Sequence, residues 1–166
     1  MKIIVDNSFL KPEHKKLIKI MMTNTFPLFW IPHQVYPDKR PYLSHAFILH
    51  DKKTNTSTIN STVSHAVLDI LKTFCFKNSI SFNKCFRANL NITFPLSSKK
   101  GKFHKDHKFK HKQLIVYLND SDGDTVLKHG GRIKFKKYRG LCFDDQLHYA
   151  ETPLTKRRAI LIFTFI

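Results

Sequence analysis

Cysteines, acidic residues and long hydrophobic runs are all scarce in this sequence. The three cysteines, Cys75, Cys85 and Cys142, form no CxxC pair and leave one thiol over, so we expect no disulfide framework and a reducing compartment. No run approaches the roughly 18 apolar residues that a membrane-spanning helix needs. The apolar run at residues 3–5 is too short for a secretory signal. These absences predict a cytoplasmic protein that binds no membrane.

The charge is strongly unbalanced, with 29 Lys and Arg against 12 Asp and Glu and a formal net charge of +17. One domain is expected for 166 residues, and 42% hydrophobic residues with 15 Phe exclude a disordered polyelectrolyte. Clustered Lys and Arg favour nucleic-acid binding, because they release counterions from phosphates. Lys, Ile, Asn and Phe also have A/T-rich codons, so an AT-rich genome alone would raise the lysine content. The charge therefore leaves nucleic-acid binding open.

The first 80 residues show two helical patterns and then the period changes. Apolar residues recur at helical spacing after Pro12 and again after Ser64, which is the expected N-cap of the second helix. The expected elements are helices at 11–25 and 64–76, strands at 26–32 and 44–50, and a polar loop at 51–62.

From residue 82 the hydrophobic period is two. Apolar and polar side chains alternate along residues 86–94, which is typical of a half-buried strand. Further strands are expected at 113–119, 131–135, 140–143 and 157–166. Helices followed by strands without intervening helices predict an α+β fold with an antiparallel sandwich or barrel.

A histidine and a carboxylate two residues apart lie in the lysine-rich stretch 98–112, which holds seven lysines. On an extended segment His104 and Asp106 project from the same face, so together they could bind one metal ion. The alternative is that Asp106 is only a charge partner of the surrounding lysines. A third ligand is needed to decide between these interpretations.

Among the ten histidines, His148 stands out because it follows an apolar strand and a polar turn and precedes the C-terminal strand. Two His and one carboxylate, with coordination positions left open, form the facial triad of non-haem Fe(II) oxygenases. Such a site needs a cation to hold an acidic cosubstrate. Arg157 and Arg158 open the C-terminal strand, and a guanidinium binds a carboxylate in bidentate fashion. Only one of them can point inward, since adjacent strand residues face opposite ways, and alternation alone leaves both open.

Two other patterns are excluded. Residues 120–124 are similar to a calcium loop, but the glycine is misplaced and no Glu occupies the twelfth position, so a turn between strands is expected. No GxxxxGK[ST] motif and no strand-linked GxGxxG motif occurs, which removes support for nucleotide binding.

Several segments, taken in order, resemble the 2-oxoglutarate and Fe(II)-dependent dioxygenases. The similarity is to the prolyl 4-hydroxylase-like branch, in particular compact members common in phages and marine microbes, and it covers roughly residues 82–166. The segments that carry it are His104-Lys-Asp106, Leu114-Ile-Val-Tyr-Leu-Asn119, Asp122-Gly-Asp-Thr125, Arg139-Gly-Leu-Cys-Phe-Asp144, His148 and Arg157-Arg-Ala-Ile-Leu-Ile162.

The resemblance implies a double-stranded β-helix, or jelly roll, with residues 82–166 as the catalytic core and residues 1–80 as helical support packed on the major sheet of a single domain. It implies that His104, Asp106 and His148 bind Fe(II) and that Tyr117 lines the cosubstrate pocket. It implies that Arg158 or Arg157 pairs with 2-oxoglutarate, and it favours Arg158, which follows His148 by the ten residues common in the family. Tyr117 could equally be a packed aromatic residue. It also brings ascorbate into consideration as a further cofactor. One position departs from the pattern: Phe94 stands where many members have a tyrosine that contacts the cosubstrate.

The implied activity is hydroxylation of a C–H bond, with a protein or peptide residue such as proline as the expected substrate. Oxidative demethylation of nucleic acid is the alternative activity, although the second arginine of those enzymes is replaced by Thr164. A non-catalytic basic jelly-roll module that binds nucleic acid is the alternative outside enzymes. The lysine-rich stretch, including Lys99, Lys100 and Lys102, is expected to form a positive rim that attracts an acidic partner.

Overall fold

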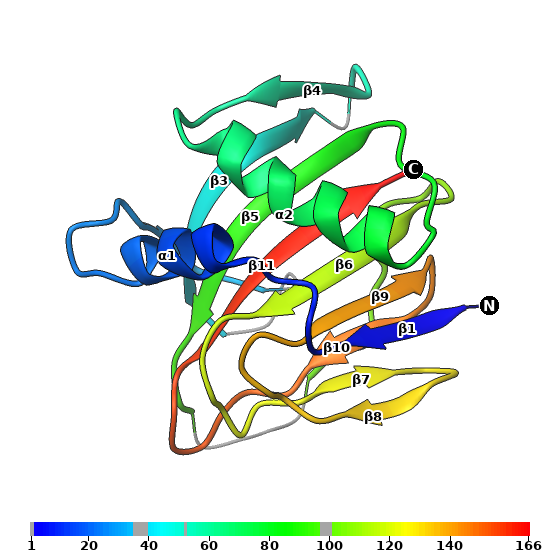
Figure 1. The fold of residues 1–166 in the computed structure, drawn as a ribbon. Coiled ribbons are helices and arrows are strands. Elements are labelled where there is room, and N and C mark those ends of the chain that lie inside the picture. Colours follow the sequence, from blue (N-terminus) through cyan, green and yellow to red (C-terminus); the bar gives the residue numbers. More distant parts are fainter. Residues whose placement is uncertain (1, 35–39, 52, 97–100) are drawn as a thin grey trace.

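Two antiparallel β-sheets and two α-helices make up the computed structural model, which describes residues 2–34, 40–51, 53–96 and 101–166 (Figure 1). The helices are α1 (Pro12–Met21) and α2 (Ser64–Lys77). The strands are β1 (Ile3–Asp6), β2 (Phe29–Ile31), β3 (Tyr42–Asp51), β4 (Thr56–Ile59), β5 (Cys85–Thr93), β6 (Lys112–Tyr117), β7 (Thr125–Leu127), β8 (Gly131–Ile133), β9 (Gly140–Asp144), β10 (His148–Ala150) and β11 (Arg158–Phe165).

Within the described residues the larger sheet has eight strands, in the order β1-β9-β6-β11-β5-β3-β2, with β4 paired to the far end of β3. The smaller sheet has the order β10-β7-β8. Residues 1–80 contribute β1 to β4 as well as both helices, and β1 and β3 pair with strands from the second half of the chain. The expected fold class, a mostly antiparallel β-sheet with two helices, is confirmed.

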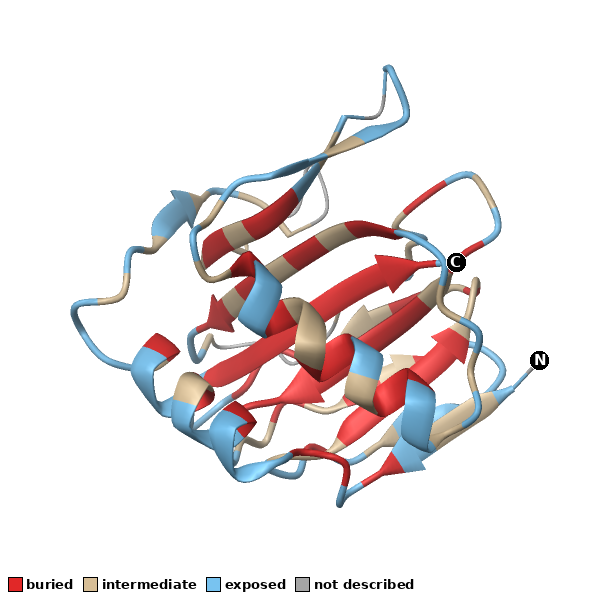
Figure 2. Ribbon diagram, turned by 45° about the horizontal axis from the view of Figure 1, so that its top comes forward, coloured by how far each residue is buried: buried red, intermediate tan, exposed pale blue. Residues whose placement is uncertain are grey.

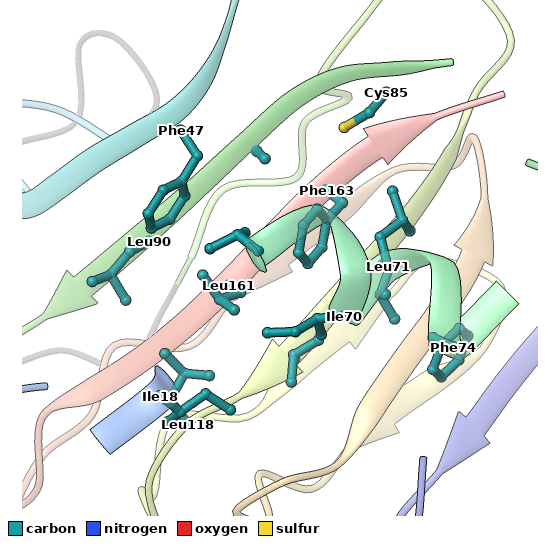
Figure 3. Close-up of a cluster of buried hydrophobic side chains, with 14 of the residues drawn as sticks. Ile18, Phe47, Ile70, Leu71, Phe74, Cys85, Leu90, Leu118, Leu161 and Phe163 are labelled. Atoms are coloured by element: carbon teal, nitrogen blue, oxygen red, sulfur yellow. The ribbon is translucent and has the colours of Figure 1, made fainter. Parts of the chain in front are cut away.

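Both helices cover one face of the larger sheet, and the main hydrophobic core lies between the helices and this face (Figures 1 and 3). Helix α2 places Ile70 and Leu71 over β11, near Leu161 and Phe163, whereas Phe74 lies near the end of the helix and packs edge-on against Phe9 (Figure 3). β11 is buried along its whole length, which Figure 2 shows as a continuous red strand at the centre of the sheet. The central position of β11 explains why its sequence is the most apolar in the chain.

A second hydrophobic core lies on the opposite face of the larger sheet and includes Tyr117, Leu127, Phe135, Phe143 and Ile160. It joins the two sheets, because Leu127 comes from β7 and Ile160 from β11. The larger sheet thus has apolar side chains on both faces, and the inner face turns toward the smaller sheet.

Strand β5 shows the alternation that its sequence predicts. Ala88, Leu90 and Ile92 point into the helix-side core, whereas Arg87 and Asn91 lie on the other face and line a cavity. This polar face of β5 is one wall of the candidate site.

Some predicted elements differ from the observed ones. Helix α1 ends at Met21 rather than near residue 25, because the hydroxyl of Thr23 donates to the carbonyl of Ile20 and competes with the helical hydrogen bonds. Val63, not Ser64, is the N-cap of α2. The Ser64 hydroxyl lies within hydrogen-bonding distance of the carbonyls of Phe47 and Ser61, to which its one proton is directed, instead of accepting from the helix.

Four strands were not expected. The region predicted as a loop at 51–62 contains β4, whose residues are mostly exposed and lack an apolar period. Strands β1, β7 and β10 have only three or four residues, too few to show a period.

Two further findings concern the cysteines and the helices. All three cysteines are free and buried. In the part of the chain that the structure describes, no helix is both long enough and apolar enough to cross a membrane.

Candidate metal and cosubstrate site

His104, Asp106 and His148 come together on the inner side of the larger sheet. Their candidate ligand atoms all lie within 4.8 Å of one another. The two histidines are held by a two-way backbone bridge: the His104 N–H donates to the His148 carbonyl at 3.0 Å, and the His148 N–H donates to the His104 carbonyl at 3.1 Å. The spacing of the two imidazoles is therefore set by the backbone.

Each imidazole has its Nδ1 atom against a backbone carbonyl two residues earlier in the chain. The partner of His104 is the carbonyl of Lys102 at 3.0 Å, and the partner of His148 is that of Gln146 at 3.1 Å. A carbonyl only accepts, so each Nδ1 is the donor, and in the neutral form of such an imidazole the lone pair is on Nε2. This is the tautomer in which Nε2 can coordinate a metal.

Asp106 is a buried carboxylate that is held in its charged form. Burial by itself would raise its pKa, but Arg87 donates from Nη2 to Oδ2 at 2.7 Å, and this cation together with the nearby histidines lowers the pKa to about 2. The other oxygen, Oδ1, lies 3.8 Å from His104 Nε2. Arg87 thus occupies one carboxylate oxygen and leaves Oδ1 toward the imidazoles.

His148 is buried and uncharged at neutral pH, because burial lowers its pKa to about 4 against the opposing attraction of Asp106. Its Nε2 lies 3.3 Å from the amide nitrogen of Gln113 on β6. That amide occupies the lone pair that a metal would use, so Gln113 must find another partner when a metal binds.

These side chains line a cavity of about 100 Å³ that extends from the histidines to Arg158. Its walls come from both sheets. The lining residues are Gln34, Tyr42, Arg87, Asn91, Thr93, His104, Asp106, Gln113, Ile115, Thr125, His148, Ala150, Arg158, Ile160 and Ile162.

Arg158 is a buried cation at the far end of this cavity, with only 3% of its surface exposed. Its Nε donates to the Gly123 carbonyl at 3.0 Å and its Nη2 to the Thr125 hydroxyl at 3.0 Å. A guanidinium has five N–H donors, so donors remain for a ligand. Burial lowers the pKa of Arg158, with Tyr117 and Asp124 opposing this effect. Within the described residues Arg158 forms no ion pair with a carboxylate.

Gly123 makes room for this arginine. A Cβ atom there would lie 2.7 Å from the Glu151 carbonyl oxygen and 3.1 Å from Cδ of Arg158. A larger residue would therefore displace the Arg158 side chain or the backbone of residue 151.

Thr125 connects Arg158 to Tyr117. The Tyr117 hydroxyl donates to Thr125 Oγ1 at 2.8 Å, and the Tyr117 ring stacks on Phe135. Tyr117 is fully buried behind Thr125 and does not line the cavity. Because Thr125 Oγ1 accepts from both neighbours, its own proton is free to point to a third group. The structure therefore places Tyr117 in a supporting position and Thr125 in the cavity wall.

Arg157 and Phe94 lie on the other side of the sheet. Both are exposed and line a surface hollow beside Met22 and Phe26 near the end of α1. Tyr42 instead places its side chain in the cavity, where it pairs across the strands with Thr93, the neighbour of Phe94. The cavity thus contains a phenol from β3 although Phe94 carries none.

Arg87, Gln113, Thr125 and Tyr42 are the site residues that the sequence did not reveal. Arg87 lies on the polar side of β5, so its face was available from the alternation, whereas Gln113 is in the apolar strand β6, which shows no alternation. Their closeness to Asp106 and His148 depends on which strands are neighbours. Lys99 and Lys100 lie outside the described residues.

No family model and no curated protein matches the sequence. Comparison of folds finds clear similarities. A 2OG-Fe(II) oxygenase family oxidoreductase from Burkholderia pseudomallei is 11% identical, with a TM-score of 0.79, and the match covers 98% of this chain and 84% of that one. A viral collagen prolyl hydroxylase from Paramecium bursaria Chlorella virus-1, solved with 2OG, is 16% identical with a TM-score of 0.64, over 99% and 95% of the two chains. A Pseudomonas putida prolyl-4-hydroxylase is 11% identical with a TM-score of 0.59, over 98% and 91%.

These similarities extend over nearly the whole of each chain. The protein therefore has the fold of the 2OG-Fe(II) oxygenases, with prolyl hydroxylases among its structural neighbours.

Proposed function

We propose that this chain is an Fe(II)- and 2-oxoglutarate-dependent dioxygenase that hydroxylates a C–H bond, with residues 1–166 acting as one domain. The observation that carries the proposal is a single cavity with a metal-ligating His-Asp-His group at one end and, at the other, a buried cation that has no carboxylate partner among the described residues. We further propose that the two sheets form the double-stranded β-helix of this fold, with the site between them.

The donor set fits Fe(II). Two imidazoles that can bind through Nε2 and one ionised carboxylate are the ligands of the facial iron triad, and they leave coordination positions for other ligands. For His148 this requires the Gln113 amide to leave Nε2. Asp106 would bind through Oδ1, since Arg87 already holds Oδ2. His104 and His148 would bind through Nε2.

The far end of the cavity fits a carboxylate. Arg158 is buried, and its hydrogen bonds to Gly123 and Thr125 leave some of its N–H donors for a ligand. The Thr125 hydroxyl, which accepts from Tyr117 and Arg158, can donate its own proton to the same ligand. We assign these two residues to the distal carboxylate of 2-oxoglutarate and Tyr117 to holding Thr125. The exposure of Arg157 supports Arg158 as the anchoring arginine.

Iron bound with 2-oxoglutarate and O₂ would supply the oxidation, in which the substrate gains one oxygen atom and the other enters succinate as CO₂ is released. The chain itself holds the ligands in place, keeps Asp106 ionised and binds the cosubstrate away from water. No side-chain general base is required of it.

A protein or peptide substrate is supported by the prolyl hydroxylases among the structural neighbours. The nucleic-acid demethylase alternative has less support. Thr164, where those enzymes have a second arginine, is buried and hydrogen-bonded to His107 Nε2 at 2.8 Å. The three free, buried cysteines support action in a reducing compartment such as the cytoplasm.

The test is succinate release from 2-oxoglutarate, with and without Fe(II), over a panel of peptides and oligonucleotides. His104→Ala, Asp106→Ala and His148→Ala should each abolish succinate release and remove high-affinity metal binding, measured by Co(II) absorption. The far-ultraviolet circular dichroism should stay unchanged, because the backbone bridge does not depend on metal. Full Co(II) binding by all three variants would contradict the proposed site.

A further inference from the structure

A second cleft lies beside the candidate metal site and shares Asp106 with it. It has a volume of about 570 Å³ and is lined by His50, Asn55, Lys105, Asp106, His107, Lys108 and Phe109. One wall is the segment that follows His104, and the other is the β3–β4 hairpin, which projects from the sheet in Figure 1. Neither the metal ligands nor the cosubstrate anchor accounts for this cleft.

The charge of the cleft is positive. Lys108 is exposed at the rim of the cleft. Lys105 also lines the cleft, and its amine forms an ion pair with Asp145 at 3.1 Å. Among the described residues of the lining, Asp106 is the single carboxylate, and its charge is offset by Arg87. An anionic ligand fits this lining.

The apolar part of the cleft is a rigid group of rings. His107 stacks on Phe109 with centroids 4.8 Å apart, and His50 packs edge-on against His107 at 5.0 Å. Phe86 packs against Phe109 at 4.7 Å from beneath the cleft lining. The rings give the cleft an apolar wall beside its cations, which suits the methylenes of a long acidic side chain.

The neighbouring strand favours a polypeptide over a nucleic acid. Asn55 lines the cleft, and β4 begins at the next residue. Among the described strands β4 pairs with β3 alone, so its outer edge offers backbone donors and acceptors. An extended peptide can pair with such an edge, whereas a nucleotide chain cannot.

We propose that this cleft binds an acidic side chain of an extended peptide and so directs acidic protein segments to the candidate metal site. Delivery of a substrate to the metal site depends on the proposed function. Binding of the acidic peptide in the cleft does not, since it requires neither metal nor cosubstrate. In this proposal Lys108 pairs with the acidic side chain, and Asn55 lies in the opposite wall of the cleft.

The test uses metal-free protein and fluorescein-labelled hexaglutamate, with hexaglutamine and hexathymidylate as comparison probes, followed by fluorescence anisotropy at low and high salt. Lys108→Glu should weaken hexaglutamate binding roughly tenfold at low salt and much less at high salt, because rim charges are screened. Asn55→Asp, which adds one negative charge without changing the side-chain size, should weaken it by about threefold. Asn55 has a positive φ of 55°, which Asp tolerates.

Matched controls separate the cleft from the net charge. Lys19→Glu on α1 and Asn24→Asp after it make the same charge changes on the helix side of the molecule and should leave hexaglutamate binding within about twofold of the unchanged protein. Equal weakening by the control and cleft variants would overturn the proposal. So would hexathymidylate binding that is tighter than hexaglutamate binding and is lost in Lys108→Glu. Failure here with intact Co(II) binding and succinate release would leave the proposed function standing.

Discussion

Replacing Arg158 separates its role in binding from its role in folding. Arg158→Met keeps an unbranched side chain and removes the charge. The guanidinium is 3% exposed and has no carboxylate partner among the described residues, so the folded protein keeps a desolvated cation without compensation. Removing it also leaves the Gly123 carbonyl and the Thr125 hydroxyl without this donor. The two effects oppose each other, and we expect the free energy of unfolding to change by no more than about 1 kcal/mol.

The effect on 2-oxoglutarate binding should be much larger. Truncating one partner of a buried, hydrogen-bonded charge pair costs about 2–5 kcal/mol. Arg158 lies at the buried end of a cavity of only about 100 Å³, where water cannot easily replace it. We therefore expect a loss of at least about 3 kcal/mol, which is more than about 100-fold in the dissociation constant.

Isothermal titration of 2-oxoglutarate into Mn(II)-loaded protein measures this constant without turnover. Arg157→Met is the matched control, because Arg157 is exposed on the other side of the sheet, and it should change the constant by less than about twofold. Similar losses in the two variants would refute the assignment of Arg158, and an unchanged constant in Arg158→Met would refute the anchoring role altogether.

Two further substitutions test the supports of the site and the fold. Thr125→Val leaves the Tyr117 hydroxyl and one Arg158 donor unpaired. Urea denaturation should therefore show a loss of about 1–3 kcal/mol in the free energy of unfolding, and titration should show a weaker affinity for 2-oxoglutarate. An unchanged free energy of unfolding would contradict the hydrogen-bond chain. Asp6 joins β1 to α2 by accepting from Ser8 and from Lys77, and although burial opposes them, these bonds lower its pKa. The contribution of ionised Asp6 to the stability of the fold is present above its ordinary pKa of 3.8 and is lost as the pH falls below that value. Asp6→Asn should therefore lower the free energy of unfolding by about 2 kcal/mol at pH 7 and by progressively less in acid. A loss of stability that does not depend on pH would contradict this explanation.

The sequence predicted those parts of the site that depend on local geometry. His104 and Asp106 share a face because they are two residues apart, and the opposite directions of Arg157 and Arg158 follow from strand alternation alone. Both inferences need no knowledge of which strands are neighbours. The preference for Arg158 over Arg157 does not follow from alternation; it comes from the resemblance to the dioxygenases, and the anchoring role stays a prediction.

The remaining site residues depend on pairings between distant strands. Arg87 and Asp106 are 19 residues apart and Thr125 and Arg158 are 33 apart, and neither pair follows a local period. Tyr42 reaches the cavity because β3 pairs with β5 in one particular register, which shifts at an irregularity after Ala46. Short strands such as β7 and β10 take their form from their neighbours, so their own residues do not predict them.

The backbone bridge between His104 and His148 closes a loop of 44 residues before any metal arrives. The entropy cost of closing that loop therefore belongs to folding of the chain, and metal binding does not have to bring the two imidazoles together. This differs from small zinc domains, in which metal binding and folding are one event. A chelator should therefore empty the site of a protein that stays folded, and the same molecule can be reloaded with a different divalent ion without passing through the unfolded state.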